Sequence, residues 1–419
     1  MSRRVCEWVA ALAALVVVAP TAAALDDKST CIECHATYVE ARYAKPVADF
    51  QHDVHRERGL SCDDCHGGDP ALGMDDMNHK ASMDPAKGYI GVPPPGGVAA
   101  MCAKCHADAE FMRRYDPTIP TDQAAQYAKS EHGRLAARGD RNSATCVSCH
   151  GAHGVRPVAE PPSPAHKRNV PALCAKCHAD ASHMKGYGIP TNQYAEYKTS
   201  VHAALLLGEG DLRAPSCADC HGAHGAAPPG VESVPRVCGR CHEVNQEHFE
   251  QSPHQASLEK FGKPMCISCH SNHAVHAPSD TMLGVADGAV CVKCHEAGTS
   301  GWTAAKEMRA ALDSLSSAIV EADAGIARVR GQGMAMDESL YDLREAKNAL
   351  TRARVVIHRF TPEPVREVVD PGLTVARAVG QRTERRIADV STRPRVLIVV
   401  WALVAVAVAA LHVRIRRLS

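Results

Sequence analysis

The stretch CVSCHGAHG at residues 146–154 places two cysteines and two histidines within nine positions, and CADCHGAHG at residues 217–225 nearly repeats it. Thiol and imidazole groups are metal ligands, and an ordinary hydrophobic core does not need them at this density. The spacing of the other cysteines shows that both stretches belong to one pattern.

Every cysteine except Cys6 falls into the motif CxxCH. The chain of 419 residues has 19 Cys and 24 His, so His occupies about one position in seventeen, and chance does not place it after every CxxC pair. The nine motifs consist of Cys31, Cys34 and His35; Cys62, Cys65 and His66; Cys102, Cys105 and His106; Cys146, Cys149 and His150; Cys174, Cys177 and His178; Cys217, Cys220 and His221; Cys238, Cys241 and His242; Cys266, Cys269 and His270; and Cys291, Cys294 and His295. Cysteines at i and i+3 lie on one side of a helical turn and can reach two vinyl groups along one porphyrin edge, while the next residue, His, meets the iron. The motifs therefore predict nine covalently bound haem c groups.

Structural zinc and redox-active dithiols fit the cysteine pairs less well than haem does. A structural zinc site takes its ligands from paired knuckles and needs no His after each pair, and nine exposed redox dithiols in one exported chain have no evident use. Composition agrees with haem, because aromatic residues make up 4% of the chain and include five Phe, too few for an ordinary core. The 47 basic and 47 acidic residues balance, which argues against a nucleic-acid partner.

Through all nine motifs, from residue 31 to residue 295, the chain resembles the multihaem c-type cytochromes. We expect a mainly α fold with much irregular structure, and the resemblance implies that closely packed porphyrins form its core. Residues 102–132 align with residues 174–202, and fainter copies span residues 31–69 and 238–273. The array is therefore four haem pairs followed by a ninth motif.

Two series of histidines recur with the copies. The first series stands before the second motif of each copy, five residues after an aromatic side chain, and consists of His55, His132, His202 and His254. The second series follows the second motif as CHxxH and consists of His153, His224 and His273. We expect both series to be distal iron ligands, with the second series serving neighbouring haems. Surface histidines inherited by duplication, and plain turn residues, are the alternatives.

The remaining distal ligands are less clearly marked. The first copy reads CHGGDP and has Asp69 in place of the second-series His, so we expect it to obtain a ligand elsewhere. Fourteen histidines remain for nine sixth positions once the nine proximal residues and His412 are set aside. We expect His79 and His358 to fill the last two positions. The reserves are His52, His166, His183, His248 and His276.

Residues 1–24 have a basic start, an apolar run and small residues near the end, which is typical of a cleaved secretory signal. Residues 25–300 form the expected nine-haem domain. An uncharged run at residues 396–413 predicts a transmembrane anchor, and residues 414–419 then form a cytoplasmic tail.

Residues 301–392 contain no Cys and carry two apolar stripes of helical period, separated by GQG at residues 331–333. They predict a helical hairpin and a linker helix, with Pro362 and Pro364 ending the second arm. The resemblance to hydroxylamine oxidoreductase and pentahaem nitrite reductase, which follow their haems with long helices, is distant.

A complete set of sixth ligands leaves no iron for substrate, so we expect an electron carrier on the periplasmic face of the cytoplasmic membrane. Its expected donor is a quinol-oxidising membrane cytochrome, and its acceptors are soluble periplasmic cytochromes or a reductase. The rival function is an oxidoreductase acting on a small nitrogen or sulfur oxyanion at one open iron. Hydroxylamine oxidoreductases use a tyrosine cross-linked to haem, and Tyr341 lies in a suitable helix, but no local motif supports it.

Overall fold

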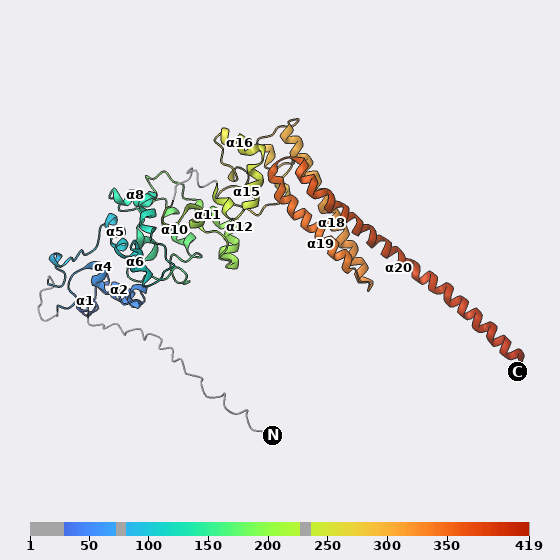
Figure 1. Cartoon of the computed structure of the whole chain (residues 1–419), viewed down its shortest axis with the longest axis horizontal. Helices are drawn as coiled ribbons and strands as arrows, with labels where there is room; N and C mark the ends of the chain where they lie inside the picture. The colour runs from blue at the N-terminus through green and yellow to red at the C-terminus, as the bar shows by residue number, and fades with distance from the viewer. Residues whose placement is uncertain (1–28, 73–80, 227–235, 419) are drawn as a thin grey trace, which may run out of the picture. The chain divides into compact units, whose positions relative to one another are not determined.

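The structure is a computed structural model that describes residues 29–72, 81–226 and 236–418, and in these ranges the chain is helical or irregular, with no strand (Figure 1). The expectation of a mainly α chain with much irregular structure is confirmed. The predicted signal segment and His79 lie outside the described residues. Two compact units divide the chain, Met1–Ala195 with His202–Pro229, and Glu196–Val201 with Gly230–Ser419.

Short helices make up the part of the chain that contains the first six motifs. They are α1 (Thr30–His35), α2 (Ala41–Phe50), α3 (Val54–Glu57), α4 (Cys62–His66), η1 (Pro85–Lys87), α5 (Pro95–His106), α6 (Ala109–Arg113), α7 (Gln123–Lys129), α8 (Glu131–Ala137), α9 (Cys146–His150), α10 (Val170–His178), α11 (Gln193–Lys198), α12 (Val201–Ala203), the π-helix η2 (Ala204–Glu209) and α13 (Cys217–His221). The six motifs lie in α1, α4, α5, α9, α10 and α13. The first motif of each copy here closes a helix, whereas the second motif is a short helix of its own. Both cysteines of each motif therefore lie on one helical turn, as attachment to one porphyrin requires.

The stretch CVSCHGAHG shows how the second-motif helices begin and end. Thr145 caps α9 and forms a capping box with Ser148. Directly after the motif, Gly151 has φ of 85°, a left-handed conformation that glycine adopts without steric strain. The turn ends the helix and carries His153 away from the haem site that precedes it.

The second unit contains the last three motifs and the longest helices. It has η3 (Cys238–Arg240), α15 (Glu243–Glu250), α16 (Pro253–Lys260), α17 (Ile267–His270), η4 (Asp280–Met282), η5 (Cys291–Lys293), α18 (Ser300–Gly331), α19 (Asp337–Val356), η6 (Ile357–Arg359) and α20 (Pro362–Leu418). The expected hairpin is α18 with α19, and the first half of α20 packs against both (Figure 1).

The prolines at 362 and 364 begin a helix, whereas we expected them to end one. Helix α19 already ends at Val356, and Phe360 turns the chain with φ of 55°. Pro362 then stands at the start of α20, where its missing N–H costs no helical hydrogen bond. The linker helix is therefore the third arm of a bundle, and it continues into the apolar C-terminal segment.

The conventional hydrophobic core lies in this three-helix bundle. Its fully buried large side chains are Leu312, Leu315, Ile326, Val329, Leu343, Val365, Val369 and Val379. A Cβ built on Gly372 of α20 would lie 2.6 Å from the Ala349 Cβ of α19, so the two helices approach closely there. Large buried apolar side chains are few among the described motif-bearing residues, which agrees with an interior filled by porphyrins.

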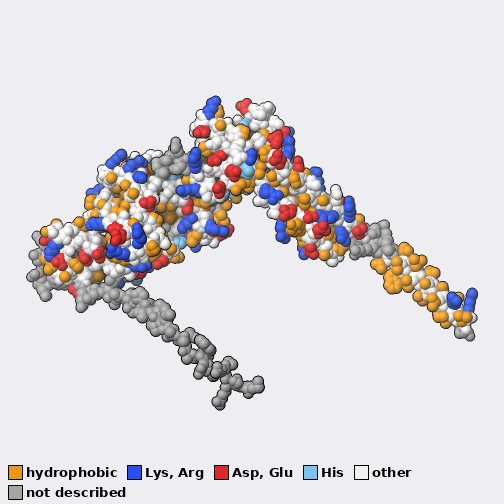
Figure 2. Space-filling view, viewed as in Figure 1, with side chains coloured by type: hydrophobic (Ala, Val, Ile, Leu, Met, Phe, Trp, Pro, Cys, Tyr) orange, Lys and Arg blue, Asp and Glu red, His pale blue; other side chains and the backbone are white. Residues whose placement is uncertain are grey.

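The segment Leu397–Leu418 of α20 is long and apolar enough to cross a membrane. Its large side chains are exposed, with Ile398 68% and Trp401 67% accessible. Figure 2 shows this apolar surface along the last part of α20, with basic side chains at its end. A continuous apolar surface is unfavourable in water, so the segment fits a membrane anchor.

Candidate haem sites

Six proximal histidines of the CxxCH motifs lie opposite a second histidine ring that is distant in the sequence. The ring centroids are 5.8–6.2 Å apart in the pairs His66 with His153, His106 with His55, His150 with His224, His178 with His132, His270 with His358, and His295 with His254. With metal–nitrogen bonds of about 2 Å, two imidazoles on opposite sides of one iron have centroids about 6 Å apart. The six pairs therefore have the spacing that a haem iron between them needs.

The two series of histidines meet their partners at different angles. First-series rings cross the proximal rings, at 84° for His55, 55° for His132 and 89° for His254. Second-series rings are nearly parallel to theirs, at 18° for His153 and 6° for His224. The ring of His358, which lies outside the copies, is also nearly parallel to its partner, at 23°.

The series also face opposite ways along the chain. His55 and His132 lie opposite the first motif of the following copy, and His254 lies opposite the ninth motif. His153 and His224 lie opposite the second motif of the preceding copy. Neighbouring copies therefore exchange their distal histidines. His202 and His273 belong to the same two series, and their role as distal ligands stays a prediction.

This direction of exchange also applies to the first copy, which has Asp69 in place of a second-series His. A second-series His at that position would face a copy before the first one. The second motif of the first copy itself faces His153, which belongs to the next copy. Asp69 instead pairs with Lys87, with 3.0 Å between Oδ2 and Nζ. At the other end of the array, His358 of η6 faces His270.

Hydrogen bonds at Nδ1 orient three of these rings. Nδ1 of His55 lies 2.8 Å from the Asp53 carboxylate, and Nδ1 of His66 lies 2.8 Å from the Gly91 carbonyl oxygen. Nδ1 of His358 lies 2.8 Å from the Val355 carbonyl oxygen. When Nδ1 donates to such an oxygen, the other ring nitrogen, Nε2, is left to bind metal.

Burial keeps many of the paired imidazoles neutral, which is the form that binds iron. It lowers the pKa of His106, His132, His150, His153, His178, His224, His254, His270 and His358.

Asp53 is a buried carboxylate that connects two of the sites. Only 1% of it is exposed, and Oδ1 accepts hydrogen bonds of 2.8 Å from both the backbone N and Nδ1 of His55. Oδ2 accepts one of 2.8 Å from the backbone N of Val155, two residues after His153. Burial alone would raise the pKa of Asp53, but these hydrogen bonds lower it below its usual value and keep the carboxylate ionised at neutral pH.

The attachment cysteines succeed one another in sequence order. Within each copy the first cysteines of the two motifs are hydrogen-bonded, as Cys31 with Cys62, Cys102 with Cys146, Cys174 with Cys217, and Cys238 with Cys266. Before haem attachment, this contact lowers the pKa of Cys31 to about 6. Thiols of successive copies also interact, as Cys65 with Cys105, Cys149 with Cys174, and Cys269 with Cys291. The cysteines that would hold the porphyrins therefore form a continuous series within each unit.

His35 has different neighbours from the six proximal histidines described above. Its ring lies 6.0 Å from that of Tyr38 and 5.8 Å from that of Tyr43, and the rings cross at 64° and 77°. Of the reserve histidines, His52 and His276 are exposed, which does not suit ligation of a buried iron, whereas His166 is buried. Tyr341 is 63% exposed on α19, which does not suit a cross-link to a buried haem.

Comparisons with known proteins identify the cofactor. Residues 138–183 match the family model of the doubled CXXCH motif, and residues 13–67 match that of cytochrome c554 and c-prime. The chain is a multihaem c-type cytochrome. C-type polyheme cytochrome OmcB of Geobacter sulfurreducens, in two strains, is 23% identical over 259 residues, which are 61% of this chain and 27% of OmcB. The cytochrome thus spans about a quarter of the length of these relatives, and no solved structure matches it.

Covalent haem c fits the residues of this cytochrome better than zinc does. Among residues 29–72, 81–226 and 236–418, no three side chains of His, Cys, Asp or Glu converge to hold a metal ion, whereas a structural zinc site needs four ligands. All 18 motif cysteines are free of disulfides, as thioether attachment requires.

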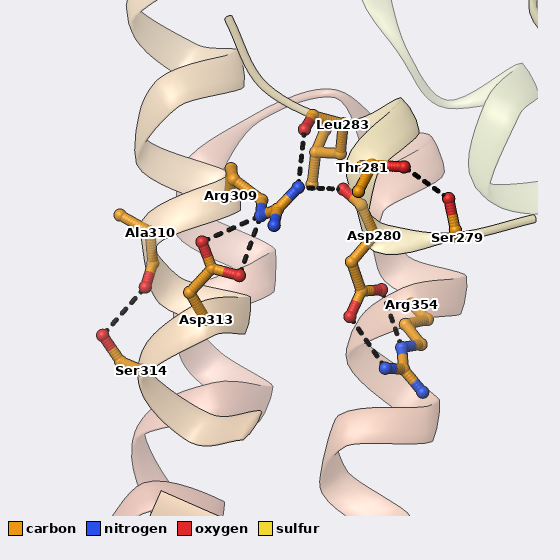
Figure 3. A network of polar contacts seen from close by, with 9 residues as sticks. All are labelled: Ser279, Asp280, Thr281, Leu283, Arg309, Ala310, Asp313, Ser314 and Arg354. Carbon is orange, nitrogen blue, oxygen red and sulfur yellow. Dashed lines mark hydrogen bonds and ion pairs between the residues drawn. The ribbon is translucent and has the colours of Figure 1, made fainter. Parts of the chain in front are cut away.

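A polar network that sequence reasoning missed ties η4, between the eighth and ninth motifs, to the bundle (Figure 3). Arg354 of α19 donates two hydrogen bonds, of 2.9 and 2.7 Å, to the carboxylate of Asp280. From α18, Arg309 donates to the backbone oxygen of Asp280 and holds Asp313 at 2.8 Å. Because Arg354 stands one turn before His358, the network helps to position the histidine that faces His270. Neither arginine has a motif that would have marked it.

Proposed function

We propose that this cytochrome carries nine haem c groups and relays electrons between membrane and soluble partners in the periplasm. The observation that carries the proposal is the 5.8–6.2 Å spacing of six histidine pairs, which would give six of the nine irons two protein ligands each. Haem c supplies reversible one-electron chemistry at its iron. Two histidines per iron favour electron exchange because they leave no coordination position for substrate.

The order of the cysteines supports a relay. Hydrogen-bonded and interacting thiols link successive motifs from Cys31 to Cys217 in the first unit and from Cys238 to Cys294 in the second. Attached porphyrins would follow one another in the same order, and short edge-to-edge separations are what fast electron exchange needs.

The apolar end of α20 supports attachment to the cytoplasmic membrane, with the haem-bearing residues on the periplasmic side, where the predicted signal would deliver them. A quinol-oxidising membrane cytochrome is the proposed donor. Soluble periplasmic cytochromes or a reductase are the proposed acceptors.

The test combines intact mass with reduction kinetics of the purified full-length protein. The mass should equal the mature polypeptide plus nine haems, and a small one-electron donor should reduce every haem in one donor-limited phase. A mass with fewer than eight haems would contradict the cofactor count. A fraction of haems that stays oxidised for minutes would contradict the relay.

A further inference from the structure

One helix position recurs beside the histidines that face, or are expected to face, the second motifs. It stands six residues before the first-series histidine of each copy, and we call it the flanking position. Its four residues are Asp49 of α2, Gln126 of α7, Glu196 of α11 and His248 of α15. No motif marks the position, because a different residue type occupies it in every copy.

In the third copy the flanking side chain lies next to a second-series histidine. Oε2 of Glu196 is 3.6 Å from Nδ1 of His273. A backbone hydrogen bond of 2.8 Å from N of Val201 to O of Val275 holds the two segments together. The carboxylate therefore stands at Nδ1 and leaves Nε2 of His273 for an iron.

The first copy repeats this arrangement. A backbone hydrogen bond of 2.9 Å joins N of Val54 to O of Val155, and these residues have the same offsets from the two series of histidines. A Cβ built on Gly154 would lie 3.6 Å from the Cβ of Asp49. The carboxylate of Asp49 acts electrostatically on the ring of His153. Asp49 thus lies beside the histidine that faces the second motif of its own copy.

The second copy has a neutral amide at the flanking position. A Cβ built on Gly225 would lie 3.7 Å from the Cβ of Gln126 and 4.0 Å from its Oε1, so Gln126 lies beside the turn after His224. The carboxylate that acts on the ring of His224 belongs to Asp122, one turn earlier in the chain. Nε2 of Gln126 donates a hydrogen bond of 2.8 Å to this carboxylate.

The fourth copy has an imidazole at the flanking position. Nδ1 of His248 accepts a hydrogen bond of 3.3 Å from Nε of Arg359, the residue that follows His358. His358 faces His270, which belongs to the second motif of the same copy. A cationic group therefore stands where the third copy has a carboxylate.

We propose that the side chain at the flanking position sets the reduction potential of the haem whose distal histidine it lies beside. A carboxylate at Nδ1 makes a ligating imidazole more basic, which stabilises ferric iron and lowers the potential. An amide or a neutral imidazole does this less. The inference rests on the axial histidines of the proposed function.

The residue types predict unequal potentials for these haems. Glu196 should give a low potential to the iron that His273 ligates, whereas His248 beside Arg359 should leave a higher potential at the iron of His270. The effect of Asp49 should be smaller than that of Glu196, because Lys45 pairs with Asp49 and offsets part of its charge.

The first experiment gives the second copy the carboxylate of the third. In the full-length holoprotein, Gln126→Glu should keep every haem and lower one potential, that of the Cys146–His150 haem. The ferric-to-ferrous preference should change by up to about tenfold, or about 59 mV for one electron, in a spectroelectrochemical titration. Gln126 is exposed, so the shift should shrink at high salt, whereas a shift caused by misfolding would not.

The matched control keeps the net charge of α7. Asp122→Asn combined with Gln126→Glu reproduces the third copy, which has Asn192 and Glu196 at these positions. The potential should still lie below that of the parent, because the carboxylate has moved to the position beside His224. A potential equal to that of the parent would show that only net charge matters, and would overturn the role of the flanking position.

The reverse change tests the third copy, since Glu196→Gln should raise one potential by a similar amount. If both single variants keep the haem content and the low-spin spectrum of the parent but move no potential, the role of the flanking position is overturned and the relay stands. Mainly high-spin iron in the oxidised parent would instead overturn the axial histidines, and the proposed function with them.

Discussion

At the scale of single residues, Asp53 is a side chain outside the motifs that contacts two candidate haem sites. Its carboxylate fixes the ring of His55 through Nδ1 and holds the loop after His153 through the backbone of Val155. A carboxylate bonded to a ligating imidazole makes that imidazole more basic, which stabilises ferric over ferrous iron. The other copies carry Ser at this position, so the effect is confined to the iron of His106.

Replacing the carboxylate by an amide should therefore raise one reduction potential. Loss of an outer ligand typically changes metal affinity by about 10- to 100-fold. At about 59 mV per tenfold for one electron, Asp53→Asn should raise the potential of the Cys102–His106 haem by at most roughly 60–120 mV. Spectroelectrochemical titration would measure the shift.

The matched control is Asp49→Asn, which removes a nearby carboxylate that is paired with Lys45 and partly exposed. The carboxylate of Asp49 acts on the ring of His153, which faces another iron, so this variant should leave the potential of the Cys102–His106 haem nearly unchanged. Equal shifts in both variants would show that the effect is one of overall charge and not of the hydrogen bond to His55.

Sequence reasoning at this scale could find the histidines but not their partners. The repeats marked His55 and His153 as candidate ligands because duplicated copies preserve a spacing. Which iron each ring faces depends on how the copies pack, and a repeat pattern does not contain that. For His358, a helical period of 3.6 residues does not predict where the ring faces, because α19 ends at Val356 and His358 lies in a 3₁₀ turn.

At the scale of helices, the three-helix bundle depends on close approaches that only glycine allows. Gly372 of α20 faces Ala349 of α19 and the side chain of Leu315 of α18. An added methyl group there would meet the Ala349 Cβ at 2.6 Å, and that atom is fixed to the helix backbone and cannot rotate away.

Gly372→Ala should therefore destabilise the bundle by about 1–3 kcal/mol, the usual cost of overpacking. Gly380 is the matched control in the same helix, since a Cβ there would meet no atom within 4 Å. Gly380→Ala should stabilise by up to about 1 kcal/mol, because alanine is the better helix former. Thermal unfolding followed by circular dichroism would compare the two, and shifts of the same sign would contradict the packing described here.

The hairpin was predictable from sequence because its apolar stripes have a helical period. The third arm was not recognised, since Pro362 and Pro364 normally end a helix. Proline ends a helix when it stands in the interior and begins one when it stands in the first turn. That distinction depended on where α19 ended, which the residues around Val356 did not mark.

At the scale of the whole molecule, the haem-bearing residues and the membrane segment are separable in sequence. No CxxCH motif lies beyond His295, and the buried residues of α20, from Val365 to Thr383, precede the apolar segment. Deleting residues 393–419 should release a soluble protein with its full haem content. Retention of the truncated protein in the membrane fraction after a salt wash would require a second attachment.

The most direct test of the paired histidines is electron paramagnetic resonance of the oxidised full-length protein. Nearly parallel imidazoles split the iron d orbitals more than crossed imidazoles do, and the two arrangements give separate low-spin signals. The angles of 6–23° and of 55–89° therefore predict two low-spin classes, of which the first includes the irons of His66, His150 and His270. Mainly high-spin iron, or a single uniform low-spin class, would contradict the axial pairs.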